Sequence, residues 1–139
     1  IILNVAIGKE KMFKVFGSNW PTYDGSCIRD YIHVMDLAEG HLKALEHLLK
    51  NKPQILNLNL GTGFGTSVLD LIKSFEIVNK VKIPYVFSKR RKGDVEKLVA
   101  SNELALKILN WSPTVTFSQL VQEMVLSEMK KYSKWKKNP

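Results

Sequence analysis

The chain has 139 residues, of which 45% are hydrophobic, 24% charged and 9% aromatic, so it can bury a core of its own and is not intrinsically disordered. It lacks a run of 18 apolar residues, which argues against a membrane partner, and its one cysteine, Cys27, excludes an internal disulfide framework and favours the cytoplasm. The net charge of +8 is the figure that suggests nucleic-acid binding.

The first elements are short. Residues 1–7 are mostly apolar, without an initiator methionine, and predict the end of a helix that stops at Gly8. A helix already under way at the first residue indicates that the chain is the C-terminal piece of a longer protein. Residues 12–16 form a short apolar segment, and residues 28–34 predict a strand or extended stretch.

The next segments predict a helix and a strand. Asp36 is followed three residues later by Glu39, the spacing of a capping box, and predicts a helix start. The helix should run to about Leu49 and bury three leucines: Leu37, Leu45 and Leu48. Residues 54–60 alternate leucine with asparagine at 56–60, which predicts a strand.

Glycines at 61, 63 and 65 predict a turn, after which Ser67 can cap a helix over about 68–78. Residues 83–87 predict a second strand, and the loop that follows, residues 89–94, is charged.

Two more helices complete the chain. Ser101 is placed to cap a short helix ending at Leu109, and the final helix should cover about 117–135. Strands that alternate with helices predict an α/β fold, with a small mixed sheet and helices, and we expect one domain over 1–139. The predicted strands are too few for a complete doubly wound domain, which agrees with the expectation that the chain is a fragment of a longer protein.

The strand, glycine-rich turn and helix around G-T-G-F-G-T-S (61–67) suggest a dinucleotide site, but the spacing is wrong. The fingerprint needs its third glycine at position 66, which is threonine here. Lysines, Lys80 and Lys82, stand where an acidic residue should bind the ribose. We therefore interpret the motif as a tight turn. The histidines and Cys27 form no pattern typical of a metal site or a nucleophile.

The arginines are more informative. Eighteen of the 21 basic residues are lysine, and arginine occurs only at positions 29, 90 and 91. Arg91 stands three residues before Asp94 in R-R-K-G-D. A guanidinium and a carboxylate at this spacing can bind one nucleotide together, the guanidinium at the phosphate and the carboxylate at the ribose hydroxyls. Arg29 could add a second fork. The pattern alone leaves two alternatives open: a nucleotide-diphosphate site or surface ion pairs.

Longer motifs around these residues resemble a known family. The run V-F-G-S-N-W-P-T-Y-D-G-S-C-I-R-D-Y-I-H-V-M-D-L-A-E-G-H (15–41) is similar to the C-terminal half of UDP-glucose (UDP-galactose) 4-epimerases. So are N-L-G-T-G-F-G-T-S-V-L (59–69), I-P-Y-V-F-S-K-R-R-K-G-D (83–94) and the closing L-N-W-S-P. The resemblance covers essentially the whole chain, with the motifs in family order.

The resemblance implies a role in substrate binding. In the family, an N-terminal Rossmann domain holds NAD and a catalytic Ser/Tyr/Lys set. The sugar is oxidised at C4, rotates as the 4-keto form and is reduced on its other face. The C-terminal domain binds UDP throughout the reaction. The residues to which the resemblance assigns substrate contacts are Lys14, Val15 and Phe16 at the uracil, Arg29 and Arg91 at the phosphates, Asp94 at the ribose and Leu98 at the sugar.

The resemblance places no catalytic, cofactor-binding or metal-binding residue in this chain, because the matching part of the family precedes Ile1. NAD would be bound by that part, and the isolated chain should not turn over substrate. Leu98 favours UDP-glucose and UDP-galactose as substrates, with a UDP-pentose, UDP-uronate or UDP-N-acetylhexosamine as the alternative. The full-length protein could form a homodimer.

A basic nucleic-acid-binding module is the rival from another class. Such a module gathers basic residues and stacking aromatic rings on one face. Here the lysines are scattered, and the aromatic residues occupy core-like positions, so we expect no nucleic-acid partner.

Overall fold

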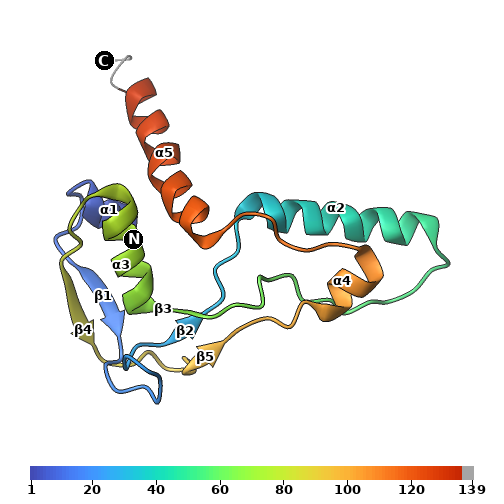
Figure 1. Ribbon diagram of the computed structural model, residues 1–139, viewed down its shortest axis with the longest axis horizontal. Helices are drawn as coiled ribbons and strands as arrows, with labels where there is room; N and C mark the ends of the chain where they lie inside the picture. Colours follow the sequence, from blue (N-terminus) through green and yellow to red (C-terminus); the bar gives the residue numbers. More distant parts are fainter. Residues whose placement is uncertain (136–139) are drawn as a thin grey trace. The chain divides into compact units, whose positions relative to one another are not determined.

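The computed structural model describes residues 1–135, which divide into two compact units (Figure 1). The first unit comprises Ile1–Cys27, Ser67–Glu96 and residues 117–135, and the second comprises Ile28–Thr66 and Lys97–Thr116. Helices and short strands are interspersed along the chain, which confirms the α/β prediction. The strands belong to two small sheets, one of two strands and one of three.

The first unit packs three helices with the two-stranded sheet. Its elements are α1 (Ile2–Ala6), β1 (Phe13–Phe16), α3 (Val68–Asn79), β4 (Tyr85–Ser88) and α5 (Phe117–Trp135). β1 and β4 are parallel, and α3 packs against α5. Its most deeply buried side chains include Phe75, Val15 and Val121, none more than 1% exposed.

The second unit is built around a tryptophan. Its elements are β2 (Ile28–Arg29), α2 (Val34–Lys50), β5 (Lys97–Leu98) and α4 (Glu103–Leu109), and β3 (Thr66–Ser67) lies at its boundary with the first unit. β2 and β5 are parallel, and the three-stranded sheet has the order β3-β2-β5. Trp111 packs with Ala105 and Leu109, next to Leu58 and Leu60.

Several helix limits are confirmed. The first helix ends before Gly8, which adopts φ +75°, a conformation that suits glycine. Ser67 caps α3, because its Oγ accepts a hydrogen bond from the Asp70 N–H at 2.9 Å. The final helix covers the predicted residues. α4 ends as predicted, but its N-cap is Asn102 rather than Ser101.

One strand prediction is wrong: residues 54–60 carry no strand. Residues 28–34, predicted as a strand or extended stretch, begin with the two-residue strand β2. Side-chain alternation is a property of any extended chain, whereas a strand also needs a neighbouring backbone with which to pair. In residues 54–60 the alternation instead turns Leu58 and Leu60 toward the tryptophan cluster.

The start and inner face of α2 also differ from the prediction. His33, not Asp36, is the N-cap, and its Nδ1 accepts from the Met35 N–H at 3.2 Å. Leu45 and Leu48 are 54% and 45% exposed, because the helix presents smaller side chains to the core. Gly40 faces Leu60 and Trp111, and Ala44 packs on the tryptophan cluster one turn later.

Asp36 has a different role: it ties α2 to a distant segment of the second unit. Asp36 is 3% exposed, and its carboxylate accepts hydrogen bonds from Thr114 N and Oγ1 at 3.1 and 3.0 Å and from Val115 N at 3.0 Å. Burial raises the pKa of this carboxyl, but the N–H and O–H donors of Thr114 and Val115 outweigh burial and hold the pKa below its ordinary value.

Candidate functional site

The candidate site in the first unit lies where two parallel strands end. Phe16 is opposite Ser88 in the β1–β4 register, and the Gly17 N–H donates to Ser88 O at 2.8 Å. Loops that leave the carboxyl ends of neighbouring parallel strands start at the same edge of a sheet. The loop over 89–94 therefore begins beside the end of β1.

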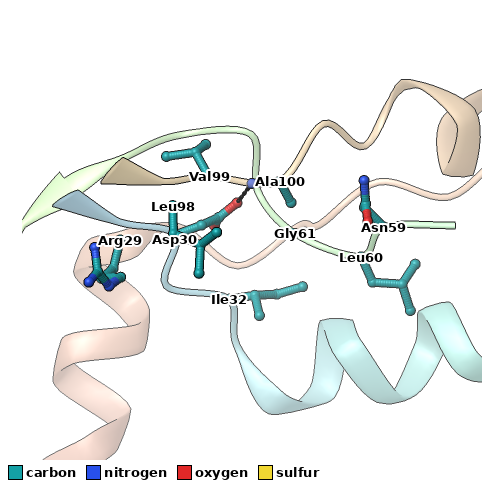
Figure 2. A pocket seen from close by; sticks show the side chains of 9 residues that line it. All are labelled: Arg29, Asp30, Ile32, Asn59, Leu60, Gly61, Leu98, Val99 and Ala100. Atoms are coloured by element: carbon teal, nitrogen blue, oxygen red, sulfur yellow. Dashed lines mark hydrogen bonds between the residues drawn. The ribbon is translucent and has the colours of Figure 1, made fainter. Parts of the chain in front are cut away.

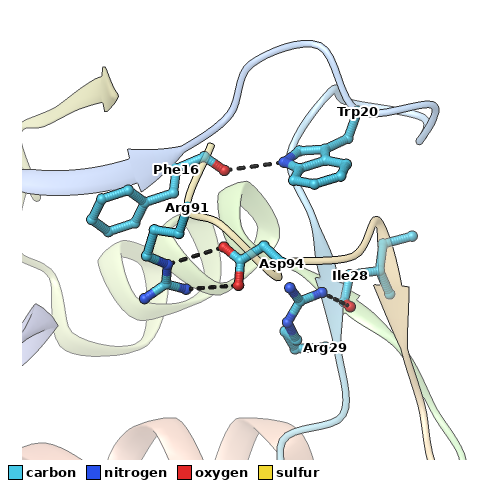
Figure 3. Close-up of polar contacts among 6 residues, drawn as sticks. All are labelled: Phe16, Trp20, Ile28, Arg29, Arg91 and Asp94. Carbon is cyan, nitrogen blue, oxygen red and sulfur yellow. Dashed lines mark hydrogen bonds and ion pairs between the residues drawn. The ribbon is translucent and has the colours of Figure 1, made fainter. Parts of the chain in front are cut away.

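Arg91 and Asp94 form an ion pair against an aromatic ring (Figure 3). Arg91 Nε donates to Asp94 Oδ2 at 3.0 Å, and Arg91 Nη2 lies 3.5 Å from Oδ1. The guanidinium carbon lies 4.5 Å from the centroid of the Phe16 ring. The Arg91 side chain is 58% exposed and that of Asp94 only 18%, so the pair presents the guanidinium to solvent and shelters the carboxylate.

The neighbouring arginine makes a second set of contacts. Arg90 Cζ lies 3.8 Å from the centroid of the Trp20 ring, and Arg90 Nη2 donates to Asn19 O at 2.5 Å. The Trp20 indole N–H in turn donates to Phe16 O at 3.0 Å, as Figure 3 shows. Two consecutive arginines thus lie over the rings of Trp20 and Phe16, and the Trp20 indole is hydrogen-bonded to the Phe16 backbone carbonyl.

Asp24 anchors the loop that carries Trp20. Its carboxylate accepts from the backbone N–H and the hydroxyl of Ser26, both at 2.8 Å, and from the hydroxyl of Ser67. Ser26 Oγ accepts from the Leu69 N–H at 3.2 Å, so the P-T-Y-D-G-S run binds directly to the first turn of α3. Nearby, the hydrogen bond that Tyr23 donates to Asp70 raises the pKa of the tyrosine.

The second unit brings together the other two residues that the resemblance singled out. Arg29 and Leu98 are direct partners in the parallel β2–β5 ladder, and both line a cavity of about 410 Å³ (Figure 2). The Arg29 guanidinium donates to Ile28 O at 2.8 Å, and Leu98 is 64% exposed.

Asp30 organises the glycine turn beside that cavity. Its carboxylate accepts from the backbone N–H groups of Thr62, Gly63 and Ala100 at 3.0 to 3.3 Å and from the Thr62 hydroxyl at 2.5 Å. Figure 2 shows Asp30 reaching the end of β5. A Cβ at Gly61 would lie 2.6 Å from Asp30 Oδ2, so this close packing requires glycine.

The glycine turn at 61–65 does not fit NAD. A pyrophosphate would need the backbone N–H groups of such a turn, and those of Thr62 and Gly63 are bound to Asp30. Asp30 thus holds the glycine segment in place through its backbone N–H groups.

Of the residues singled out in the sequence, the structure brings Lys14, Val15 and Phe16 together with Arg91 and Asp94 in the first unit, and pairs Arg29 with Leu98 in the second. Trp20, Arg90 and Asp30 were missed. Trp20 and Arg90 are 70 positions apart, and only the R-R doublet signalled that Arg90 stands beside a site residue.

Within residues 1–135, no group of three or more His, Cys, Asp and Glu side chains is arranged to hold a metal ion. Over the same residues, each helix is too short or too polar to cross a bilayer.

A family model described as GDP-mannose 4,6 dehydratase matches residues 1–124. The UDP-glucose 4-epimerase of Rhizobium leguminosarum bv. trifolii is 43% identical over 122 residues, which are 88% of this chain and 37% of that protein. That of Bacillus subtilis (strain 168) is 48% identical over 110 residues, 79% of this chain and 32% of the relative. The chain thus spans about a third of the length of these curated relatives.

Solved structures agree. The UDP-glucose 4-epimerase from Bifidobacterium longum in complex with NAD⁺ and UDP superposes with a TM-score of 0.88 at 37% identity, over 93% of this chain and 38% of the other. The UDP-glucose 4-epimerase from Stenotrophomonas maltophila, with bound NAD and formylated UDP-arabinopyranose, superposes with a TM-score of 0.86 at 38% identity. The match covers 94% of this chain and 39% of the other. The resemblance to UDP-glucose 4-epimerases is confirmed.

Proposed function

This chain belongs to the family described as GDP-mannose 4,6 dehydratase, and from that premise we propose that it is the UDP-sugar-binding portion of a UDP-glucose/UDP-galactose 4-epimerase. The observation that carries the proposal is the Arg91–Asp94 pair stacked on Phe16 at the end of β1. Relatives named UDP-glucose 4-epimerase at 40% to 48% identity, and a structural neighbour in complex with UDP, support the choice of ligand.

The phosphates would bind at Arg91. The contact with Asp94 engages Nε and Nη2, which leaves the rest of the planar guanidinium available for a diphosphate. Asp94 is sheltered, and a carboxylate so held can accept hydrogen bonds from ribose hydroxyls. These features favour the nucleotide site over the surface ion pair that the sequence left open, because an ordinary surface pair is exposed on both sides.

The uracil would bind along β1. The N–H groups of Phe13 and Gly17 point to β4, where they donate to Pro84 O and Ser88 O. Strand alternation therefore turns the backbone groups of Lys14 and Phe16 to the opposite edge of β1, where the Trp20 indole N–H binds the Phe16 carbonyl. The Lys14 carbonyl and the Phe16 N–H are the groups that would meet the uracil. Uracil carries a donor and acceptors on one side of its ring, and it can pair with such an edge while the Phe16 ring lies beside it.

The second unit, by itself, brings together two of the proposed residues. Arg29 and Leu98 are neighbours in the β2–β5 ladder and line one cavity, where the guanidinium would bind phosphate and the apolar Leu98 side chain would line a sugar pocket. We propose that NAD and the catalytic groups belong to the part of the relatives' length that this chain does not span, since the glycine turn at 61–65 does not suit a dinucleotide.

Calorimetric titration of the chain with UDP, uridine and GDP tests the proposed site. UDP should bind at least tenfold more tightly than uridine, because charge-assisted hydrogen bonds to phosphate are worth about 1.5 kcal/mol or more. GDP should bind more weakly than UDP, because guanine is too large for a uracil edge. Equal binding of UDP and GDP, or the absence of heat with a chain shown to be folded by circular dichroism, would contradict the proposal.

A further inference from the structure

Trp20 and Arg90 are the part of the site that the nucleotide-binding role does not yet explain. Trp20 is 8% exposed, and its indole N–H is bound to Phe16 O, on the edge of β1 that faces away from β4. Arg90 covers the indole ring at 3.8 Å and ties down the same loop through Asn19 O.

The two side chains meet over a glycine. A Cβ at Gly17 would lie 2.2 Å from Trp20 Nε1 and 3.0 Å from Arg90 Cγ, so a larger residue would push both side chains away. Gly17 also has φ +86°, which disfavours other residues. The chain therefore bends sharply at the end of β1, and the indole and the arginine pack onto the bend.

We propose that Trp20 and Arg90 are positioning residues, which hold the Phe16 ring and the Arg91 guanidinium in the arrangement that receives the UDP diphosphate. The inference rests on the proposed function. Phe16 is fixed at its carbonyl by Trp20, and Arg91 is fixed because its chain neighbour Arg90 is stacked and hydrogen-bonded. A binding group that is already in place loses less conformational entropy when the ligand arrives.

The geometry favours this role over phosphate binding by Arg90 itself. Its guanidinium face is occupied by the Trp20 ring, and its Nη2 is bound to a backbone carbonyl. Arg91, one residue later, lies over the Phe16 ring and holds a carboxylate instead. Of these two adjacent arginines, Arg90 therefore contacts the protein, and Arg91 would contact the ligand.

Three variants of the chain test the inference by UDP titration: Arg90→Ala, Arg90→Lys and Trp20→Phe. We expect Arg90→Ala to weaken UDP binding about 5- to 30-fold and Trp20→Phe, which keeps a ring but loses the N–H donor, about 3- to 10-fold. Arg90→Lys should restore part of the affinity, since it keeps the charge over the ring. Lys89→Ala is the control, because it removes one charge from the same loop.

Two further readouts separate positioning from a general structural role. In a double-mutant cycle, Arg90→Ala should cost little once Arg91 is already alanine, whereas independent effects would add. In NMR spectra without nucleotide, Arg90→Ala and Trp20→Phe should shift the Arg91 Nε–H resonance, while the melting temperature stays within a few degrees.

The outcomes are distinct. If UDP does not bind the unaltered chain, the proposed function fails, and the inference is then decided by the Arg91 Nε–H resonance alone. An unchanged resonance in both variants overturns it. If UDP binds, then unchanged affinity in both variants, or a loss fully additive with Arg91→Ala, overturns it as well.

Discussion

Replacing Arg91 with alanine is expected to weaken the binding of UDP to the chain about 10- to 100-fold, the largest effect at the proposed site. The loss reflects removal of a guanidinium that would make charge-assisted hydrogen bonds to the diphosphate, each worth about 1.5 to 3 kcal/mol. It should fall on UDP and UDP-glucose and spare uridine, which carries no phosphate. Titration calorimetry of the three ligands measures the difference.

Two other variants sharpen this result. Arg91→Lys keeps the charge but loses the planar fork, so it should recover only part of the affinity. Lys92→Ala removes the charge of the adjacent exposed residue and should change binding less than threefold at physiological salt, where isolated surface charges are screened. Equal losses in Arg91→Ala and Lys92→Ala would show that only net charge matters, against a specific phosphate contact.

Asp36→Asn is expected to lower the free energy of unfolding by about 2 to 4 kcal/mol near neutral pH. The substitution removes the charge on a buried group that three donors from Thr114 and Val115 surround, and the new amide would direct N–H groups at other donors. Urea denaturation, followed by circular dichroism, measures the loss.

The same variant carries a pH signature. The folded pKa of Asp36 lies below the ordinary value of 3.8, so its charge stabilises the fold fully above about pH 4. That contribution is lost as the pH falls through the lower folded pKa. The difference between the native chain and Asp36→Asn should therefore narrow at about pH 3. Glu39→Gln, on an exposed position of α2, should stay within about 0.5 kcal/mol of the native chain. A difference that widens in acid would refute the role given to Asp36.

Features that depend on residues close together in the sequence were predicted correctly. Ser67 was identified as a cap because its partner, the Asp70 N–H, is three residues away. The Arg91–Asp94 pair was foreseen for the same reason, since both residues belong to one loop. In each case the two partners are three residues apart, and at so short a separation their spacing in the sequence determines the distance between them.

Features that depend on distant partners were missed. Asp36 has the spacing of an N-cap, but donors 78 and 79 positions away engage its carboxylate, and His33 takes the cap. Leu45 was expected to be buried from its apolar side chain, yet α2 turns Gly40 to the core because Leu60 and Trp111 need the space.

The candidate site shows the same division. The sequence named Arg29 and Leu98 separately, but that they are direct neighbours follows only from the β2–β5 register. Similarly, the doublet at 90–91 gave no sign that one arginine stacks on Trp20 and the other on Phe16, because the rings come from a segment some 70 residues earlier.

The most direct test of the proposed UDP site is an NMR measurement of contacts between labelled chain and unlabelled UDP. Intermolecular NOEs should connect the uracil protons to Lys14 and Phe16 and the ribose protons to the loop around Asp94, with the Arg91 side-chain resonances shifting as the diphosphate binds. NOEs confined to other surfaces of a folded chain, with Arg91 undisturbed, would contradict the account.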